Sequence, residues 1–155
     1  GQPGKDVVWV PTGDELVTKM LHTAKVTKDD LVYDLGAGDG KIAIAAGREF
    51  GARAIGIEYN PDMVELSRQN AAKEGVAAKA TFDKADIFQT DFSKATVITL
   101  FLLPELNVKL RPTILDMKPG TRVVANSFDM GDWKPEKTDT VGSSNVYLWR
   151  VPPRG

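Results

Sequence analysis

The chain has 155 residues, and its 20 basic and 21 acidic side chains leave a net charge of −1. This length predicts a single domain over residues 1–155, and the near-neutral charge offers no bulk attraction for nucleic acid or an anionic membrane. The absence of cysteine excludes disulfides, thiolate nucleophiles and cysteine metal sites, and His22 alone leaves little for a metal cluster, so we expect no bound metal.

A helix is expected over residues 14–24, because apolar side chains such as Leu16 and Met20 recur on one helical face. Thr12 and Glu15 have the spacing of a capping box at the start of this helix. His22 falls on the polar side of the helix, which predicts a solvent-exposed histidine.

The following stretch, residues 31–40, has the sequence LVYDLGAGDG. Its apolar beginning has the length of a buried parallel strand, which ends at Asp34 and Leu35. Gly36, Gly38 and Gly40 come next, and a chain without Cβ atoms can turn there and lie flat against a ligand.

A helix over residues 41–50, closed by Gly51, is expected after this loop. Its unpaired N-terminal amides would point back at the glycines, where they favour an anionic or strongly polar ligand group.

Three kinds of ligand-binding loop compete for this stretch. A phosphate-binding P-loop is excluded, because Leu35 and Ile42 occupy the places of its required glycine and hydroxyl residue. The dinucleotide pattern is satisfied in its alanine-tolerant form by Gly38, Gly40 and Ala43, and it stays open. The third pattern, an acid followed by G-x-G-x-G, resembles the first motif of class I S-adenosylmethionine-dependent methyltransferases.

A second strand is expected over residues 53–58, ending in Glu58. A carboxylate at the carboxyl end of this strand suits a ribose diol, because it accepts both hydroxyl hydrogens. Tyr59 either lies on an adenine face or packs at the sheet edge. Asn60 and Pro61 cap and start the next helix, which is expected to run to about Glu74.

Five further strands and one helix are expected in the rest of the chain. The strands cover residues 80–84, 95–102, 121–127 and a hairpin of 137–141 with 146–151, and the helix covers residues 107–117. Leu103, Pro104 and Glu105 are expected to end the 95–102 strand. Trp133 and Trp149 are expected to pack on the sheet face.

Together these elements resemble the class I methyltransferase fold, an α/β Rossmann-like, doubly wound, mostly parallel seven-stranded sheet with an antiparallel C-terminal hairpin. Asp34, Glu58 and Asp86 follow the first three strands, and the carboxyl edge of a parallel sheet is where open α/β folds bind ligands. A dinucleotide enzyme has no need of the third acid, so the methyltransferase interpretation is favoured over it.

Four segments are more closely similar to a group of small lysine methyltransferases with mitochondrial members in eukaryotes and relatives in prokaryotes: VPTGDELVTKML, YDLGAGDGKIAIAA, GIEYNPDMVELSRQNA and PGTRVV. The resemblance implies S-adenosylmethionine as cofactor, bound by Thr12, Asp34, Gly36, Gly38, Gly40, Glu58, Tyr59, Asp86 and Ile87. In this interpretation Thr12 contacts the cofactor's amino-acid end, Asp86 accepts from the adenine amino group and the Ile87 backbone meets the ring edge. The chain departs from the group at Gly13, where a proline is usual.

The segment TLFLLP, residues 99–104, lacks the polar residue and double proline with which base-methylating enzymes hold a planar amine. This argues against a nucleic-acid base as the acceptor. The resemblance to the lysine methyltransferases implies a protein substrate presenting a lysine, and we expect no nucleic acid and no membrane as partner. No catalytic base is assigned, since desolvation beside a sulfonium can neutralise the amine; Phe101 and Leu103 are either a wall of that channel or core. A small-metabolite methyltransferase and a non-catalytic S-adenosylmethionine-binding module are the alternatives, and the expected compartment is the cytoplasm.

Overall fold

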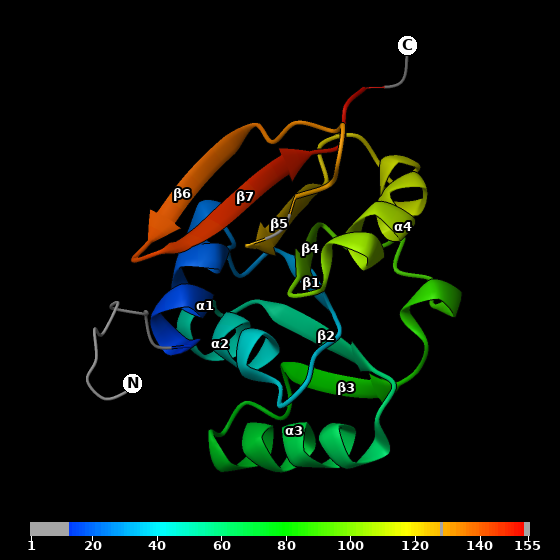
Figure 1. Cartoon of the computed structure of the whole chain (residues 1–155). Helices are drawn as coiled ribbons and strands as arrows, with labels where there is room; N and C mark the ends of the chain where they lie inside the picture. The colour runs from blue at the N-terminus through cyan, green and yellow to red at the C-terminus, as the bar shows by residue number, and fades with distance from the viewer. Residues whose placement is uncertain (1–12, 128, 154–155) are drawn as a thin grey trace, which may run out of the picture.

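In the computed structural model, which describes residues 13–127 and 129–153, seven strands pair in the order β3-β2-β1-β4-β5-β7-β6. The strands are β1 (Leu31–Leu35), β2 (Arg53–Glu58), β3 (Ala80–Lys84), β4 (Val97–Leu100), β5 (Arg122–Asn126), β6 (Lys137–Val141) and β7 (Ser144–Arg150). The first five are parallel, and β7 pairs antiparallel with both β5 and β6 (Figure 1). The expected doubly wound sheet with an antiparallel hairpin is confirmed.

Helices cover both faces of this sheet. They are α1 (Gly13–Thr23), α2 (Lys41–Phe50), α3 (Pro61–Lys73) and α4 (Pro104–Leu115), with a single 3₁₀ turn η1 (Ile87–Gln89) after β3. Buried side chains of α1, α2 and α3 share one apolar cluster, whereas those of α4 belong to a second cluster on the opposite face. The core is therefore two apolar layers separated by the sheet.

Local signals explain most of the boundaries. The amides of Asp62 and Met63 donate to the Asn60 side chain, and Pro61 occupies the first turn of α3, so this helix begins where the sequence predicts. Gly51 closes α2 in a left-handed conformation. His22 is exposed on α1, as expected.

Three boundaries differ from expectation around β4, which begins at Val97 rather than at residue 95. The strand ends at Leu100 rather than at residue 102, because the chain leaves the sheet there and Phe101 and Leu103 are 49% and 56% exposed. Pro104 does not simply end the strand: it starts α4, three residues before the predicted helix, since proline is well suited to the first helical turn. Pro112 lies inside that helix.

The C-terminal hairpin is tighter than predicted, because Val141 pairs directly with Ser144 and leaves a two-residue turn. Trp149 is fully buried in the second apolar cluster, and its indole nitrogen donates to the Trp133 carbonyl oxygen at 2.7 Å. The expected packing of both tryptophans on the sheet is confirmed. In the part of the chain that the structure describes, no helix has the length and apolar character needed to span a bilayer.

Gly40 joins the glycine loop to the core. Its φ is 90°, and a Cβ added there would lie 2.8 Å from the Ser67 Cβ and 2.9 Å from Cζ of Phe82. We expect Gly40→Ala to lower the free energy of unfolding by about 2 kcal/mol or more, through a strained backbone and an overpacked contact. Thermal unfolding checks this, with Gly75→Ala as control, since Gly75 also has a positive φ but faces open space. An equal loss in both variants would show that the contact with α3 and β3 does not matter.

Candidate functional site

The glycine loop lies over the carboxyl ends of β1 and β2. The amides of Gly36 and Ala37 both donate to the Ile57 carbonyl oxygen, at 2.9 and 3.0 Å, which fastens the loop to β2. A Cβ added at Gly36 would lie 2.6 Å from the Leu102 side chain, whereas one at Gly38 would meet nothing within 4 Å. The loop is thus packed tightly at Gly36 and presents bare backbone to open space at Gly38.

Glu58 ends β2 beside this loop. One carboxylate oxygen accepts from the Gly38 amide at 2.8 Å and the other accepts from the Asn60 amide at 3.1 Å. A carboxylate offers about four acceptor positions, so each oxygen retains capacity for one more donor. The backbone therefore holds Glu58 in place with two acceptor positions left for a ligand.

Asp34 lies beneath the loop and is only 1% exposed. The Thr99 hydroxyl donates to its Oδ1 at 2.9 Å, and its Oδ2 has no hydrogen-bond partner. Burial raises the pKa of Asp34 to about 7; the Thr99 hydrogen bond opposes this shift, and the nearby charges of Glu58 and Asp39 add to it. Buried polar atoms are normally hydrogen-bonded, so the unpaired oxygen of Asp34 is suited to a polar or cationic ligand group.

Two pockets meet at the glycine loop. The Asp34 pocket, of about 210 Å³, is lined by Asp34, Gly36, Gly38, Lys41, Phe101 and their neighbours, together with Gly13 and Val17 of α1. The Glu58 pocket, of about 310 Å³, is lined by Gly36, Ile57, Glu58, Tyr59 and residues 85–88. Because Gly36 lines both, the two form one binding region along the carboxyl edge of the sheet.

The structure brings most of the predicted site residues together. Asp34, Gly36 and Gly38 line the Asp34 pocket, and Glu58, Tyr59, Asp86 and Ile87 line the Glu58 pocket. Gly40 is buried against Ser67 and Phe82 and is not among the lining residues of either pocket. Thr12, with its predicted cap, lies outside the described residues.

The ring of Tyr59 is 72% exposed, and the Lys84 ammonium lies 5.7 Å from its centroid. The side chain of Asp86 caps η1 by accepting from the Phe88 amide at 2.9 Å through one oxygen. Asp86 also lines the Glu58 pocket. For Phe101 the sequence leaves open whether it is channel wall or core; it is exposed and lines the Asp34 pocket. Leu103 is also exposed but is not among the residues that line this pocket.

Sequence reasoning missed several lining residues. Asp39 and Lys41 stand inside and after the glycine motif, so their positions could have identified them, whereas Val17 carried only the signal of a core residue. Thr99 lines neither pocket but donates to Asp34, and it carried no signal, because this contact depends on which strand lies beside β1.

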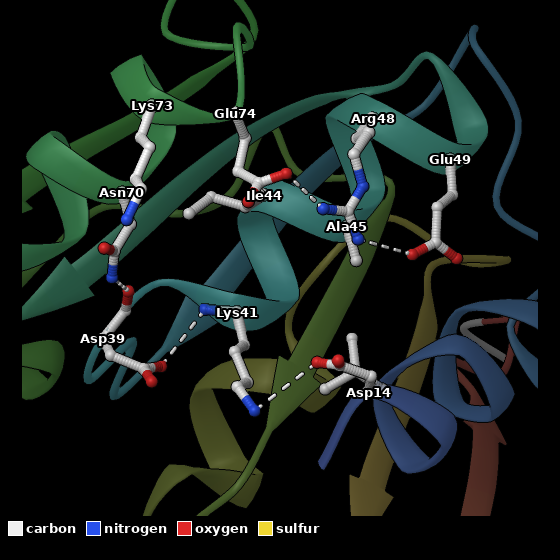
Figure 2. A pocket seen from close by; sticks show the side chains of 11 residues that line it. Asp14, Asp39, Lys41, Ile44, Ala45, Arg48, Glu49, Asn70, Lys73 and Glu74 are labelled. Carbon is white, nitrogen blue, oxygen red and sulfur yellow. Dashed lines mark hydrogen bonds and ion pairs between the residues drawn. The ribbon is translucent and has the colours of Figure 1, made fainter. Parts of the chain in front are cut away.

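A third pocket, of about 240 Å³, lies between the N-terminal half of α1, α2 and α3 (Figure 2). Its charges are largely paired with one another: Arg48 bridges Glu74 and Glu49, and Lys41 pairs with Asp14 at 3.4 Å. Within residues 13–127 and 129–153 no group of three or more metal-binding side chains is suited to hold a metal ion. The carboxyl-edge region is therefore the candidate site.

Residues 34–137 match the family model of the ANTKMT methyltransferase domain. The chain belongs to this family. As a member, it is a class I S-adenosylmethionine-dependent methyltransferase, which confirms the predicted enzyme class and cofactor.

Curated and solved relatives of this methyltransferase agree with that assignment. It is 42% identical to a protein-lysine N-methyltransferase of Saccharolobus islandicus over 94% of each chain. It is 31% identical to the mouse adenine nucleotide translocase lysine N-methyltransferase, over 77% of this chain and 53% of that one. A crystal structure described as an RNA methyltransferase from Salinibacter ruber, in complex with S-adenosylhomocysteine, is 47% identical with a TM-score of 0.90, covering 94% of this chain and 95% of that one.

Proposed function

We propose that the methyltransferase transfers methyl groups from S-adenosylmethionine to the side-chain amine of a lysine in a protein. The observation that carries this proposal is the 42% identity, over nearly the whole of both chains, to a protein-lysine N-methyltransferase. We propose further that residues 1–155 form one domain and that it works in the cytoplasm, where the cofactor is made, without a nucleic-acid or membrane partner.

We assign the adenosine half of the cofactor to the Glu58 pocket. The spare acceptor positions of Glu58 suit the two ribose hydroxyls, and the second oxygen of Asp86 suits the adenine amino group. The Ile87 backbone meets the ring edge and Tyr59 offers an aromatic face. The support for this assignment is that one pocket contains both carboxylates and the aromatic ring.

We assign the amino-acid half of the cofactor to the Asp34 pocket. The unsatisfied Oδ2 of Asp34 suits the cofactor's ammonium group, and the open backbone at Gly38, with Gly36 beside it, allows close approach. Gly40 acts by starting α2 rather than by contact, and Thr12 belongs to the site by resemblance. A carboxyl that is buried and half satisfied without a ligand supports this fit.

Bound in these pockets, the cofactor supplies a methyl group on a positively charged sulfur. The acceptor lysine must first lose its proton, which at neutral pH costs on the order of 4 to 5 kcal/mol from a pKa near 10.4. Phe101 presents exposed apolar surface at the Asp34 pocket, and an apolar wall there lowers the amine pKa by excluding water. This arrangement aligns and neutralises the amine without a dedicated base.

RNA is the second candidate substrate, because the relative from Salinibacter ruber is described as an RNA methyltransferase. The charges around the site disfavour it here. Four of the residues that line the two pockets carry carboxyl groups, Asp34, Asp39, Glu58 and Asp86, while the lining cation Lys41 is ion-paired with Asp14. A protein binds the phosphate backbone of RNA through lysine and arginine side chains that are free to pair with the phosphates. Carboxylates, by contrast, attract the positively charged side chain of a lysine.

The two substrates are separated by a labelling experiment. The protein is incubated with a cell extract and S-adenosylmethionine carrying a labelled methyl group, and the product is treated with protease or with ribonuclease. We expect protease to release the label, and acid hydrolysis to yield methylated lysine. Glu58→Ala is expected to give no label, while Glu65→Ala, an exposed acid on α3, should behave as wild type. Label released only by ribonuclease would overturn the proposal in favour of RNA.

A further inference from the structure

Asp34 and Thr99 are direct neighbours in adjacent strands. The register of β1 and β4 pairs Asp34 with Thr99. In the same row of paired residues across the sheet, Gly56 and Phe82 follow on the side of Asp34, and Val124 follows on the side of Thr99. Phe82 and Val124 belong to the apolar cluster under α1, α2 and α3. Along this row Thr99 is thus the one neighbour able to donate a hydrogen bond to the Asp34 side chain.

The Thr99 hydroxyl has a single proton and is fully buried. Its oxygen lies 2.9 Å from Oδ1 of Asp34 and 3.5 Å from the Tyr33 carbonyl oxygen, so the geometry favours donation to the carboxyl. This bond fixes one oxygen of the buried carboxyl. The other oxygen, Oδ2, has no partner, and the residue lines the Asp34 pocket.

We propose that Thr99 is a positioning residue for the cofactor: by holding Oδ1 of Asp34, it keeps Oδ2 available to the ammonium group of S-adenosylmethionine. This inference rests on the proposed placement of the amino-acid half in the Asp34 pocket. Thr99 does not touch the cofactor itself; it acts through the orientation of Asp34. Its removal leaves the carboxyl without its donor, and the ammonium then meets a carboxyl that is free to rotate.

The test compares two ligands that differ only at the end concerned. S-adenosylhomocysteine carries the amino-acid group, whereas 5′-methylthioadenosine has the same adenosine and sulfur without it. We expect Thr99→Val to weaken the binding of S-adenosylhomocysteine by about tenfold or more, the effect of losing a hydrogen bond to a charged group, while the affinity for 5′-methylthioadenosine changes by about twofold at most. Thr99→Ser, which keeps the hydroxyl, is expected to restore binding.

Thr96→Val is the matched control. The Thr96 hydroxyl donates to Oδ1 of Asp30 at 2.7 Å, at the opposite end of the same pair of strands and away from both pockets. This variant removes the same kind of bond, and we expect it to lower the melting temperature without changing the ratio of the two affinities. If Thr99→Val does not fold, Thr99→Ala takes its place in the same titrations.

An equal loss of affinity for both ligands in the Thr99 variants, or no loss for either, would overturn the inference. Failure of Thr99→Ser to recover S-adenosylhomocysteine binding would also overturn it, since the hydroxyl is then not the group that matters. If the wild-type protein binds neither ligand, the proposed site itself is wrong. This outcome is distinct from a failure of the Thr99 inference, because it is seen with the wild-type protein before any variant is measured.

Discussion

Glu58→Ala is expected to weaken the binding of S-adenosylhomocysteine by about 100-fold to 1,000-fold, which corresponds to the loss of two hydrogen bonds to a charged acceptor. The variant also leaves the Gly38 and Asn60 amides without the oxygens that now fix them. Both effects act on the same ligand, because Gly38 lines the adjoining Asp34 pocket. Isothermal titration calorimetry at pH 8 measures the change.

Two companion variants make the Glu58 result specific. Glu58→Gln keeps an acceptor oxygen and should fall between wild type and alanine. Glu65→Ala removes an exposed carboxylate on α3 that accepts a long hydrogen bond from Gln69, at 3.3 Å, and should bind as wild type. Unchanged affinity in correctly folded Glu58→Ala would contradict the assignment of the ribose to this carboxylate.

Asp34→Asn is expected to act in opposite directions on stability and on binding. Because burial raises the pKa of Asp34 to about 7 from 3.8, the folded protein holds this proton more tightly than the unfolded chain. The free energy of unfolding therefore falls as the pH rises from about 4 to about 7, by at most about 4 kcal/mol, and the deficit persists above pH 7. Asparagine does not ionise, so the ligand-free variant should melt at a higher temperature than wild type at pH 8, with a smaller difference at pH 5.

The same carboxyl makes cofactor binding depend on pH. An ammonium group favours the ionised form of Asp34, so below pH 7 the wild type must first release a proton, and affinity should drop by up to about tenfold per pH unit. Asp34→Asn should bind S-adenosylhomocysteine weakly and, between pH 5.5 and about 7, without this dependence. The charged groups around Asp34 are Glu58, Asp39 and Lys41. Melting curves and titrations at several pH values check both effects; a variant that binds as tightly as wild type would exclude Asp34 as the ammonium site.

Much of the fold was predictable because turn residues mark its boundaries. The bounds of α2 and β2 were predicted to the residue. Gly51 ends α2, and β2 must end before Asn60 and Pro61, which start α3. The apolar run at β4 was misjudged, because Phe101 and Leu103 are as apolar as strand residues yet lie exposed. Apolar character alone does not distinguish a buried strand from an exposed apolar surface beside a site.

The residues of the candidate site were predictable where a single short stretch of sequence identifies them. Asp34 and Glu58 each follow from a strand and the turn after it. Thr99 was not predictable in the same way, because its partner lies 65 residues away and the pairing of β4 with β1 is a property of sheet order. Gly40 stands in the motif with the other glycines, but its close approach to Ser67 of α3 and Phe82 of β3 could not be read from the motif.

The sheet order also has a consequence for how the chain matures. The strands β1, β2 and β3 are consecutive, so the Glu58 pocket can assemble from residues up to 88, but β1 keeps an open edge until β4 has been synthesised. During that interval the apolar strand β1 presents unpaired backbone groups, a template for wrong pairing with another nascent chain. Docking of β4 closes this edge and in the same step delivers Thr99 to Asp34. The contact that we propose for positioning the amino-acid half of the cofactor and the protection from aggregation are thus acquired together.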